Sequence, residues 1–325
     1  MKMQRQTVLL TMLAAVLIIW FSWGQKDFNR VMKIARTNMD TEVVKSMGEI
    51  QYIPGDMHAM RTLNVYAPED AENLPVVVFM HGGGWRGGTP NAVIWGLETS
   101  DLQDAGILLV SITHRANYQA MSPGPEEDVA AAIAWTIENI AEYGGDPERI
   151  FLAGHSSGAH VMTLAALDPS LLGAHELDAS MLAGVIHMSG IIDLTISLKV
   201  DGGIESITRY AGEDPERLRE ASPLYHIGKG PLPPFLIVHG EDEGDWAKRE
   251  SEQFRDALIE HDCEARVVEV AGVDHYTLVQ FLNPRQKEFM DFIGVEMPEQ
   301  PEEPAEKEHE TEEPVGDEPE GSHQA

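Results

Sequence analysis

Apolar residues recur along the chain in two alternating patterns between about residues 61 and 292. Short runs that are apolar throughout are typical of strands in a sheet covered on both faces, and longer segments show the spacing of helices. The predicted strands have the sequences TLNVYAP, VVVFMHG, ILLVSIT, IFLAG, GVIHMSG, FLIVHG and ARVVEV. Because strands and helices alternate, the pattern predicts one α/β domain with a mostly parallel central sheet and helices on both faces.

The helix after the third of these strands has the clearest boundaries. Pro125 suits the first helical turn, and the acidic residues after it lie where the helix dipole favours negative charge. Gly144 and Gly145 tolerate left-handed backbone geometry and are expected to end the segment. Further helices are predicted over residues 157–167, 246–260 and 284–292, and a short one over 28–36.

The chain is divided by composition into four parts. We expect an N-terminal hydrophobic segment over 1–25, a connecting segment over 26–60, the α/β domain over 61–295 and a tail over 296–325. From Pro298 to Ala325 there are eleven acidic residues, one lysine and five prolines. Such a segment buries too little apolar surface to offset the entropy of ordering, which predicts a disordered acidic tail. A tail that binds a partner is the alternative.

The N-terminal segment has no charged residue from Gln6 to Gln25. These 20 residues include the apolar stretch TVLLTMLAAVLIIWFSWG. At about 1.5 Å per residue they reach roughly 30 Å, the thickness of the hydrocarbon core of a bilayer. We therefore predict a membrane anchor over residues 7–24. The alternative is a signal peptide cleaved near Gly24, which would leave a secreted or periplasmic protein.

The net charge of −31 argues against a nucleic-acid partner, because phosphate binding needs a basic surface. Cys263 is the single cysteine of the sequence, so an intrachain disulfide is excluded.

The pentapeptide Gly154-His155-Ser156-Ser157-Gly158 lies between a predicted strand and a predicted helix. A sharp strand-to-helix turn places the central residue in strained geometry and crowds the residues two positions away, where glycine removes the clash. The hydroxyl of the central serine then lies at the start of a helix, whose dipole favours developing negative charge. This setting predicts that Ser156 is a nucleophile, and the alternative is an ordinary loop.

A glycine-rich stretch, HGGGW over residues 81–85, follows the strand VVVFM. Glycines let the backbone approach a substrate closely and direct N–H groups at it. We predict that the oxyanion donors are the N–H groups of Gly83, Gly84 and Ser157. A glycine turn without function is the alternative.

His275 follows the last predicted strand and is the expected general base, since the order in this architecture is serine, acid, histidine. His155 is expected to point away from Ser156, and both it and His160 are interpreted as structural or pocket-lining residues. The loop after the strand FLIVHG offers four candidate acids, namely Glu241, Asp242, Glu243 and Asp245.

Residues 60–293 resemble the α/β-hydrolase superfamily, and within it the esterase group that includes bifunctional feruloyl/acetyl-xylan esterases, kynurenine formamidases and isoprenylcysteine methylesterases. The resemblance is carried by VYAPEDAENLPVVVFMHGGGWRGG, EEDVAAAIAWTIENIAEYGGDPERIFLAGHSSGAH, SGIIDL and HGEDE, with DH after them. It implies a serine hydrolase of the α/β-hydrolase fold that needs no cofactor and no metal.

By position, the resemblance assigns the nucleophile to Ser156 and the base to His275. The acid of the family usually falls four residues after the histidine of HG, which is Glu243 here. Glutamate stands where the family usually has aspartate, so Asp242 and Asp245 remain alternative acids. The same resemblance assigns the oxyanion donors to Gly83, Gly84 and Ser157.

The expected function is hydrolysis of small-molecule carboxylic esters through an acyl-enzyme on Ser156. We expect short acyl groups, because the largest excursion between His81 and His275 is the polar stretch over 194–227. An amidase of the aryl-formamidase type and a non-catalytic, membrane-tethered scaffold on the same fold are the alternatives.

The orientation of the predicted anchor rests on two opposing arguments. The four basic residues between 26 and 36 favour a cytoplasmic position for the chain beyond the anchor. Signal-anchored hydrolases usually face outward, and we therefore expect the domain on the extracytoplasmic side.

Overall fold

The computed structural model describes residues 49–197 and 204–298 of the chain. The predicted membrane segment, the predicted helix over 28–36 and the acidic tail from residue 299 onward lie outside these ranges. Within the described ranges, no helix combines the length and the apolar character needed to cross a membrane.

The strands of the described residues form one sheet of eight, in the order β1-β2-β4-β3-β5-β6-β7-β8. The strands are β1 Ile50–Gln51, β2 Thr62–Tyr66, β3 Leu74–Met80, β4 Leu108–Ile112, β5 Gly145–His155, β6 Gly184–Met188, β7 Phe235–Gly240 and β8 Ala265–Val270. β2 pairs antiparallel with β1 and β4, and the remaining neighbours pair parallel. The prediction of a mostly parallel sheet is confirmed.

The sheet begins earlier in the chain than predicted. Ile50 pairs with Leu63 and Gln51 with Thr62, so β1 lies inside the segment expected to be only a connection over 26–60. A strand of two residues is too short to show an alternating pattern. Its place at the sheet edge depends on pairing with β2, which the local sequence does not encode.

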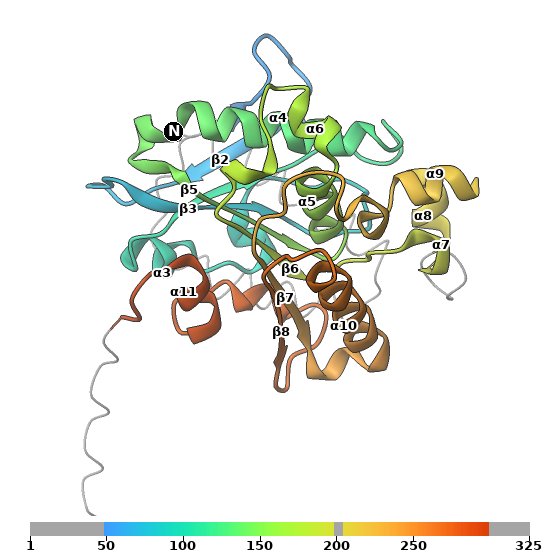
Figure 1. Ribbon diagram of the computed structural model, residues 1–325. Helices are drawn as coiled ribbons and strands as arrows, with labels where there is room; N and C mark the ends of the chain where they lie inside the picture. The colour runs from blue at the N-terminus through green and yellow to red at the C-terminus, as the bar shows by residue number, and fades with distance from the viewer. Residues whose placement is uncertain (1–48, 198–203, 299–325) are drawn as a thin grey trace, which may run out of the picture.

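Helices cover both faces of the sheet, as predicted (Figure 1). They are α3 Thr99–Asp104, α4 Gly124–Asn139, α5 Ser157–Leu167, α6 Pro169–Gly173, α7 Leu194–Ser197, α8 Ile204–Ala211, α9 Pro215–Glu220, α10 Asp245–Ile259 and α11 Lys287–Ile293. α4 is shorter than expected, because a 3₁₀ turn over Ile140–Tyr143 replaces its last turn before Gly144. α11 begins three residues after the expected start at Pro284.

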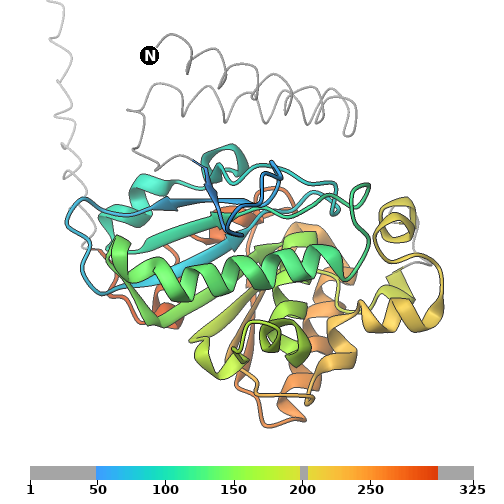
Figure 2. The same cartoon turned by 90° about the horizontal axis from the view of Figure 1, so that it is seen from above.

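The two faces of the sheet bury separate apolar cores. Along β3, Val76, Val78 and Met80 pack into the core beneath α4 and α5, whereas Val77 and Phe79 pack into the core beneath α3 and α11. Figure 2 shows α4 lying along one face of the twisted sheet. Because successive side chains of a strand point to opposite faces, burial on both sides explains why these strands are apolar throughout.

The carboxyl ends of four central strands meet at one edge of the sheet. Met80 pairs with Gly154, His155 with Met188, and His187 with Ile237. The loops that follow β3, β5, β6 and β7 therefore start side by side. In open parallel sheets this edge is where binding and catalytic groups gather.

Candidate active site

Ser156 lies at a strained turn between β5 and α5. β5 ends at His155, α5 begins at Ser157, and Ser156 has φ 55° and ψ −123°. The glycines two positions away are required by packing: a Cβ on Gly154 would lie 2.5 Å from the Gly158 carbonyl oxygen, and one on Gly158 would clash with that of Met80. The sequence-based expectation for this turn agrees with its geometry.

Three of the predicted side chains are brought together at the sheet edge. His275 Nε2 lies 3.0 Å from Ser156 Oγ, and His275 Nδ1 lies 2.7 Å from Glu243 Oε2. With Glu243 ionised, Nδ1 carries the proton and donates to the carboxylate, which leaves Nε2 as an acceptor for the serine hydroxyl. This is the arrangement of a nucleophile, a base and a group that orients the base.

The carboxylate of Glu243 is buried and held by two further donors. Its Oε1 accepts from Ser189 Oγ at 2.5 Å and from the Gly240 N–H at 2.8 Å. Burial by itself raises the pKa of Glu243, but the hydrogen bonds, that from His275 first, outweigh it and lower the pKa below its ordinary value. The side chain therefore stays charged at neutral pH.

The alternative acids lie elsewhere. Asp242 and Asp245 are exposed, and within the described residues the carboxylate that contacts His275 is that of Glu243. Asp245 is the first residue of α10, after the capping residue Gly244. Its charge lies near the positive end of the helix dipole, so this position suits an aspartate.

The loop after β3 lies against the serine. A Cβ on Gly82 would lie 3.1 Å from Ser156 Cβ, and Gly83 and Gly84 have φ values of 135° and 63°. Both values favour glycine, because L side chains clash there. The N–H of Ser157 begins α5, and the first N–H groups of a helix have no partner within it.

His155 packs beside the base. Its ring centroid lies 4.8 Å from that of His275, and its Nε2 lies 2.7 Å from the His275 carbonyl oxygen. Burial, together with the neighbouring imidazole, lowers the pKa of His155 to about 3. A neutral ring that holds the backbone of His275 fits the structural role expected for this residue.

His160 belongs to a buried aromatic cluster behind the glycine loop. Its Nδ1 accepts from Trp85 Nε1 at 3.3 Å and its Nε2 lies 2.8 Å from the Ala221 carbonyl oxygen. Trp85 in turn stacks on Tyr210 of α8 at 4.5 Å between ring centroids. The cluster couples the loop after β3 to α8.

Sequence reasoning missed three residues around the three assembled side chains. Ser189 follows β6 and holds Glu243, while Trp246 and Tyr276 place their rings 6.3 Å and 5.8 Å from the His275 ring. Ser189 could have been noticed as a hydroxyl at the carboxyl end of a strand next to β7. No local pattern marks the two aromatic residues.

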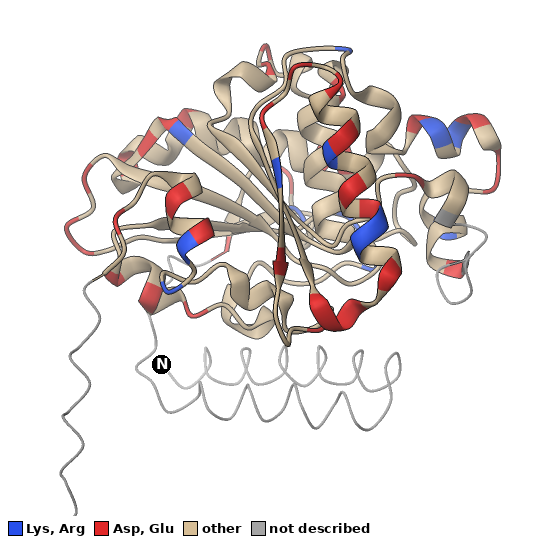
Figure 3. Cartoon of the chain, turned by 60° about the horizontal axis from the view of Figure 1, so that its bottom comes forward, with Lys and Arg blue, Asp and Glu red and all other residues tan. Residues whose placement is uncertain are grey.

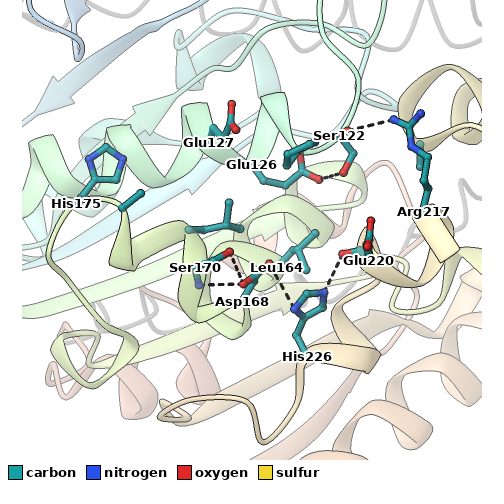
Figure 4. A pocket seen from close by; sticks show the side chains of 14 residues that line it. Ser122, Glu126, Glu127, Leu164, Asp168, Ser170, His175, Arg217, Glu220 and His226 are labelled. Carbon is teal, nitrogen blue, oxygen red and sulfur yellow. Dashed lines mark hydrogen bonds and ion pairs between the residues drawn. The ribbon is translucent and has the colours of Figure 1, made fainter.

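A separate pocket of about 500 Å3 lies between α4, α5, α6 and α9 (Figure 4). Its lining includes none of Ser156, Glu243 and His275. Asp168 and His226 come within 3.5 Å of each other there. Because the pocket lacks the serine and its base, we place the chemistry at the sheet edge instead.

Figure 3 shows more acidic than basic residues on the face it presents, in keeping with the net charge of −31, so a phosphate backbone would meet like charge there. Among residues 49–197 and 204–298, no group of three or more His, Cys, Asp or Glu side chains is arranged to hold a metal ion.

Curated proteins similar to this chain include esterases. It is 34% identical over 234 residues to a probable isoprenylcysteine alpha-carbonyl methylesterase, ICMEL1, of Oryza sativa subsp. japonica, covering 66% of the chain and 54% of that protein. It is 29% identical over 297 residues to Esterase LipQ of Mycobacterium tuberculosis, covering 80% of the chain and 69% of that protein. The chain thus spans about half the length of the methylesterase.

Solved structures share the fold. Esterase B from Lactobacillus Rhamnosis matches with a TM-score of 0.67 at 18% identity, covering 87% of this chain and 95% of that one. A bifunctional GH43-CE protein of Bacteroides eggerthii matches with a TM-score of 0.63 at 26% identity, covering 75% of this chain and 37% of that one. The BD-FAE family model matches residues 63–258, more than half of the chain. The chain belongs to the BD-FAE family, in the esterase group of the α/β-hydrolases.

Proposed function

We propose that this protein is a carboxylic-ester hydrolase that acts through an acyl-enzyme on Ser156. The observation that carries the proposal is the continuous contact from Ser156 through His275 to Glu243. A serine in that setting can lose its proton to the imidazole as it attacks a carbonyl carbon. Membership of an esterase group supports the ester as the bond that is cleaved.

In the first half-reaction, Ser156 Oγ attacks the ester carbonyl while His275 Nε2 takes the hydroxyl proton. The N–H groups of Gly83, Gly84 and Ser157 stabilise the oxyanion, and His275 returns the proton to the departing alcohol. Water then attacks the acyl-enzyme with His275 as base, which releases the carboxylic acid and restores the serine.

A fluorophosphonate probe tests the nucleophile. The wild-type protein is expected to be labelled, and Ser156→Ala is expected to be unlabelled and to lose turnover by several orders of magnitude with an unchanged circular dichroism spectrum. The adjacent Ser157→Ala retains the hydroxyl at 156 and serves as the matched control. Labelling that persists in Ser156→Ala would overturn the proposal.

We further propose a preference for short acyl groups. α8 packs against the loop after β3: Arg86 Nη2 donates to Ser206 Oγ at 2.9 Å, and a Cβ on Gly84 would lie 3.3 Å from the same oxygen. We expect this packing to leave little room for a long acyl chain. Rates on p-nitrophenyl esters should fall as the acyl chain lengthens, and faster cleavage of long chains contradicts the idea. An aryl formamide in the same panel tests the amidase alternative.

We also propose that residues 7–24 anchor the protein to a membrane, with the domain on the extracytoplasmic side. The support is the uncharged stretch from Gln6 to Gln25 in the sequence. Full-length protein is expected in the membrane fraction, and a truncated protein beginning at Lys26 is expected to be soluble and active. Full-length expression that yields soluble protein with an N-terminus at Gln25 would identify a cleaved signal peptide instead.

A further inference from the structure

The loop after β3 makes a tight turn over residues 83–86. The Arg86 N–H donates to the Gly83 carbonyl oxygen at 3.4 Å. The two residues between them, Gly84 and Trp85, have φ values of 63° and 57°. Two successive positive φ values are typical of the mirror-image β-turns, which favour Gly, Asn or Asp at both central positions. Glycine adopts this geometry freely, whereas a bulky residue such as tryptophan is strained in it.

The side chain of Trp85 is anchored behind this turn. It is 3% exposed, and its Nε1 donates to His160 Nδ1 at 3.3 Å. Its indole stacks on Tyr210 of α8 with 4.5 Å between the ring centroids. A strained backbone conformation persists only where its surroundings impose it, and such residues cluster at functional sites. The contacts of the buried indole therefore hold the turn in a conformation that its sequence does not favour.

Asn117 holds the same turn from the loop after β4. Its backbone N–H donates to the Trp85 carbonyl oxygen at 2.7 Å, and its Nδ2 donates to the Gly84 carbonyl oxygen at 3.3 Å. Asn117 Oδ1 is buried without a hydrogen-bond partner in the part of the chain that the structure describes. A buried acceptor left unpaired is destabilising, which indicates that this amide serves the bond to Gly84 rather than the stability of the fold.

The turn carries groups that the proposed reaction needs. The N–H groups of Gly83 and Gly84 are proposed oxyanion donors, and a donor is effective only when it is directed at the place where the oxyanion forms. The Gly83 carbonyl and the Gly84 N–H belong to one planar peptide unit. The bond from the Arg86 N–H that closes the turn therefore also sets the direction of the Gly84 N–H.

We infer that Trp85 and Asn117 are positioning residues, which hold the turn so that the Gly84 N–H is directed at the oxyanion. The inference rests on the proposed function and adds two residues to its machinery. Both act through the backbone of the loop, one from behind it through a buried ring and the other through a side-chain amide. Their effect should appear only where charge develops on the carbonyl oxygen.

The test compares two esters that differ in the carbonyl atom alone. They are p-nitrophenyl acetate and p-nitrophenyl thionoacetate, in which sulfur replaces the carbonyl oxygen. Because sulfur is a weak hydrogen-bond acceptor, the thiono ester gains little from the oxyanion donors. A misdirected donor should lower kcat/KM more for the oxygen ester than for the thiono ester. A displaced base or nucleophile instead slows both esters by the same factor.

Two variants loosen the turn in different ways. Asn117→Ala removes the side-chain bond to Gly84 and leaves the backbone bond to Trp85. For this variant kcat/KM should fall about tenfold on the oxygen ester and less than about threefold on the thiono ester, since a displacement of about 1 Å can cost a hundredfold in rate. Trp85→Phe keeps a ring that can stack on Tyr210, loses the bond to His160 and should show the same pattern.

Matched controls make the same chemical changes away from the turn. Asn139 Nδ2 donates to the Trp135 carbonyl oxygen at 2.7 Å, as Asn117 does to that of Gly84. Asn139 ends α4, shortly before β5 begins at the opposite edge of the sheet. Asn139→Ala and Trp135→Phe should therefore leave the ratio of the two rates at the wild-type value, and circular dichroism establishes that every variant folds.

The ratio of the two rates decides the outcome. A larger loss on the oxygen ester supports the inference, and equal losses on both esters, or no loss on either, would overturn it. Loss of the ratio in one variant alone overturns the role of the other residue. Asn117→Ala tests the turn by itself if Trp85→Phe does not fold. Failure of the proposed function is distinct, because Ser156→Ala would then cleave both esters as fast as the wild type does.

Discussion

Replacement of Glu243 by glutamine tests the orientation of the base with a change of one atom. In the structure, Oε1 accepts from two donors, Ser189 Oγ and the Gly240 N–H, while Oε2 faces His275 Nδ1. A glutamine can satisfy both donors only with its carbonyl oxygen in the Oε1 place. Its NH2 group then faces Nδ1.

This orientation imposes the wrong tautomer on His275. Nδ1 becomes an acceptor for the amide, so the proton moves to Nε2, which can no longer take one from Ser156. Loss of the carboxylate in a triad lowers turnover about 10⁴-fold, which is about 5.4 kcal/mol in the barrier. We expect a loss of this size in Glu243→Gln, with the fold retained.

The assay is kcat on p-nitrophenyl acetate, with circular dichroism to establish that each variant folds. Asp242→Asn and Asp245→Asn are the matched controls, since each makes the same chemical change on an exposed neighbour. Both are expected to stay within about tenfold of wild type, a difference of about 1.4 kcal/mol. Glu243→Gln activity above a tenth of wild type, or a crippled Asp242→Asn, would refute the reasoning.

Three further predictions concern stability and the neighbouring histidines. Burial lowers the pKa values of His81 and His160 to about 3, from an ordinary value of 6.5. Between these two pH values the unfolded chain therefore binds more protons than the folded chain. The free energy of unfolding that is present above pH 6.5 should be lost as the pH falls toward 3, by up to about 1.4 kcal/mol per pH unit for each histidine. A melting temperature that is constant from pH 7 to 5 contradicts this. Gly158→Ala should lower the free energy of unfolding in denaturant by roughly 1–3 kcal/mol and lose activity, because its Cβ would meet the Met80 carbonyl oxygen. Gly173→Ala, with open space around its Cβ, should show neither effect. In kinetic assays His275→Ala should lose orders of magnitude in kcat and His160→Ala much less, and similar losses would show that the base is misassigned.

The sequence alone predicted the architecture, because its signals are local. The apolar strand runs reflect burial on both faces of the sheet, which requires apolar residues at successive positions. The turn around Ser156 could also be predicted, because its close packing requires glycine at positions 154 and 158. Such features need no knowledge of distant parts of the chain.

The tertiary structure decided what depends on distant partners. Glu243 was one of four acidic residues on a loop, and in the sequence only the resemblance selected it, by position. The pairing of β6 with β7 brings Ser189 to its carboxylate. β1 was missed because its two residues form a strand solely by pairing with β2. Trp246 and Tyr276 lie 30 positions apart in sequence. Their place beside His275 follows from the parallel pairing of β7 and β8, which sets the loops after both strands at the same edge of the sheet.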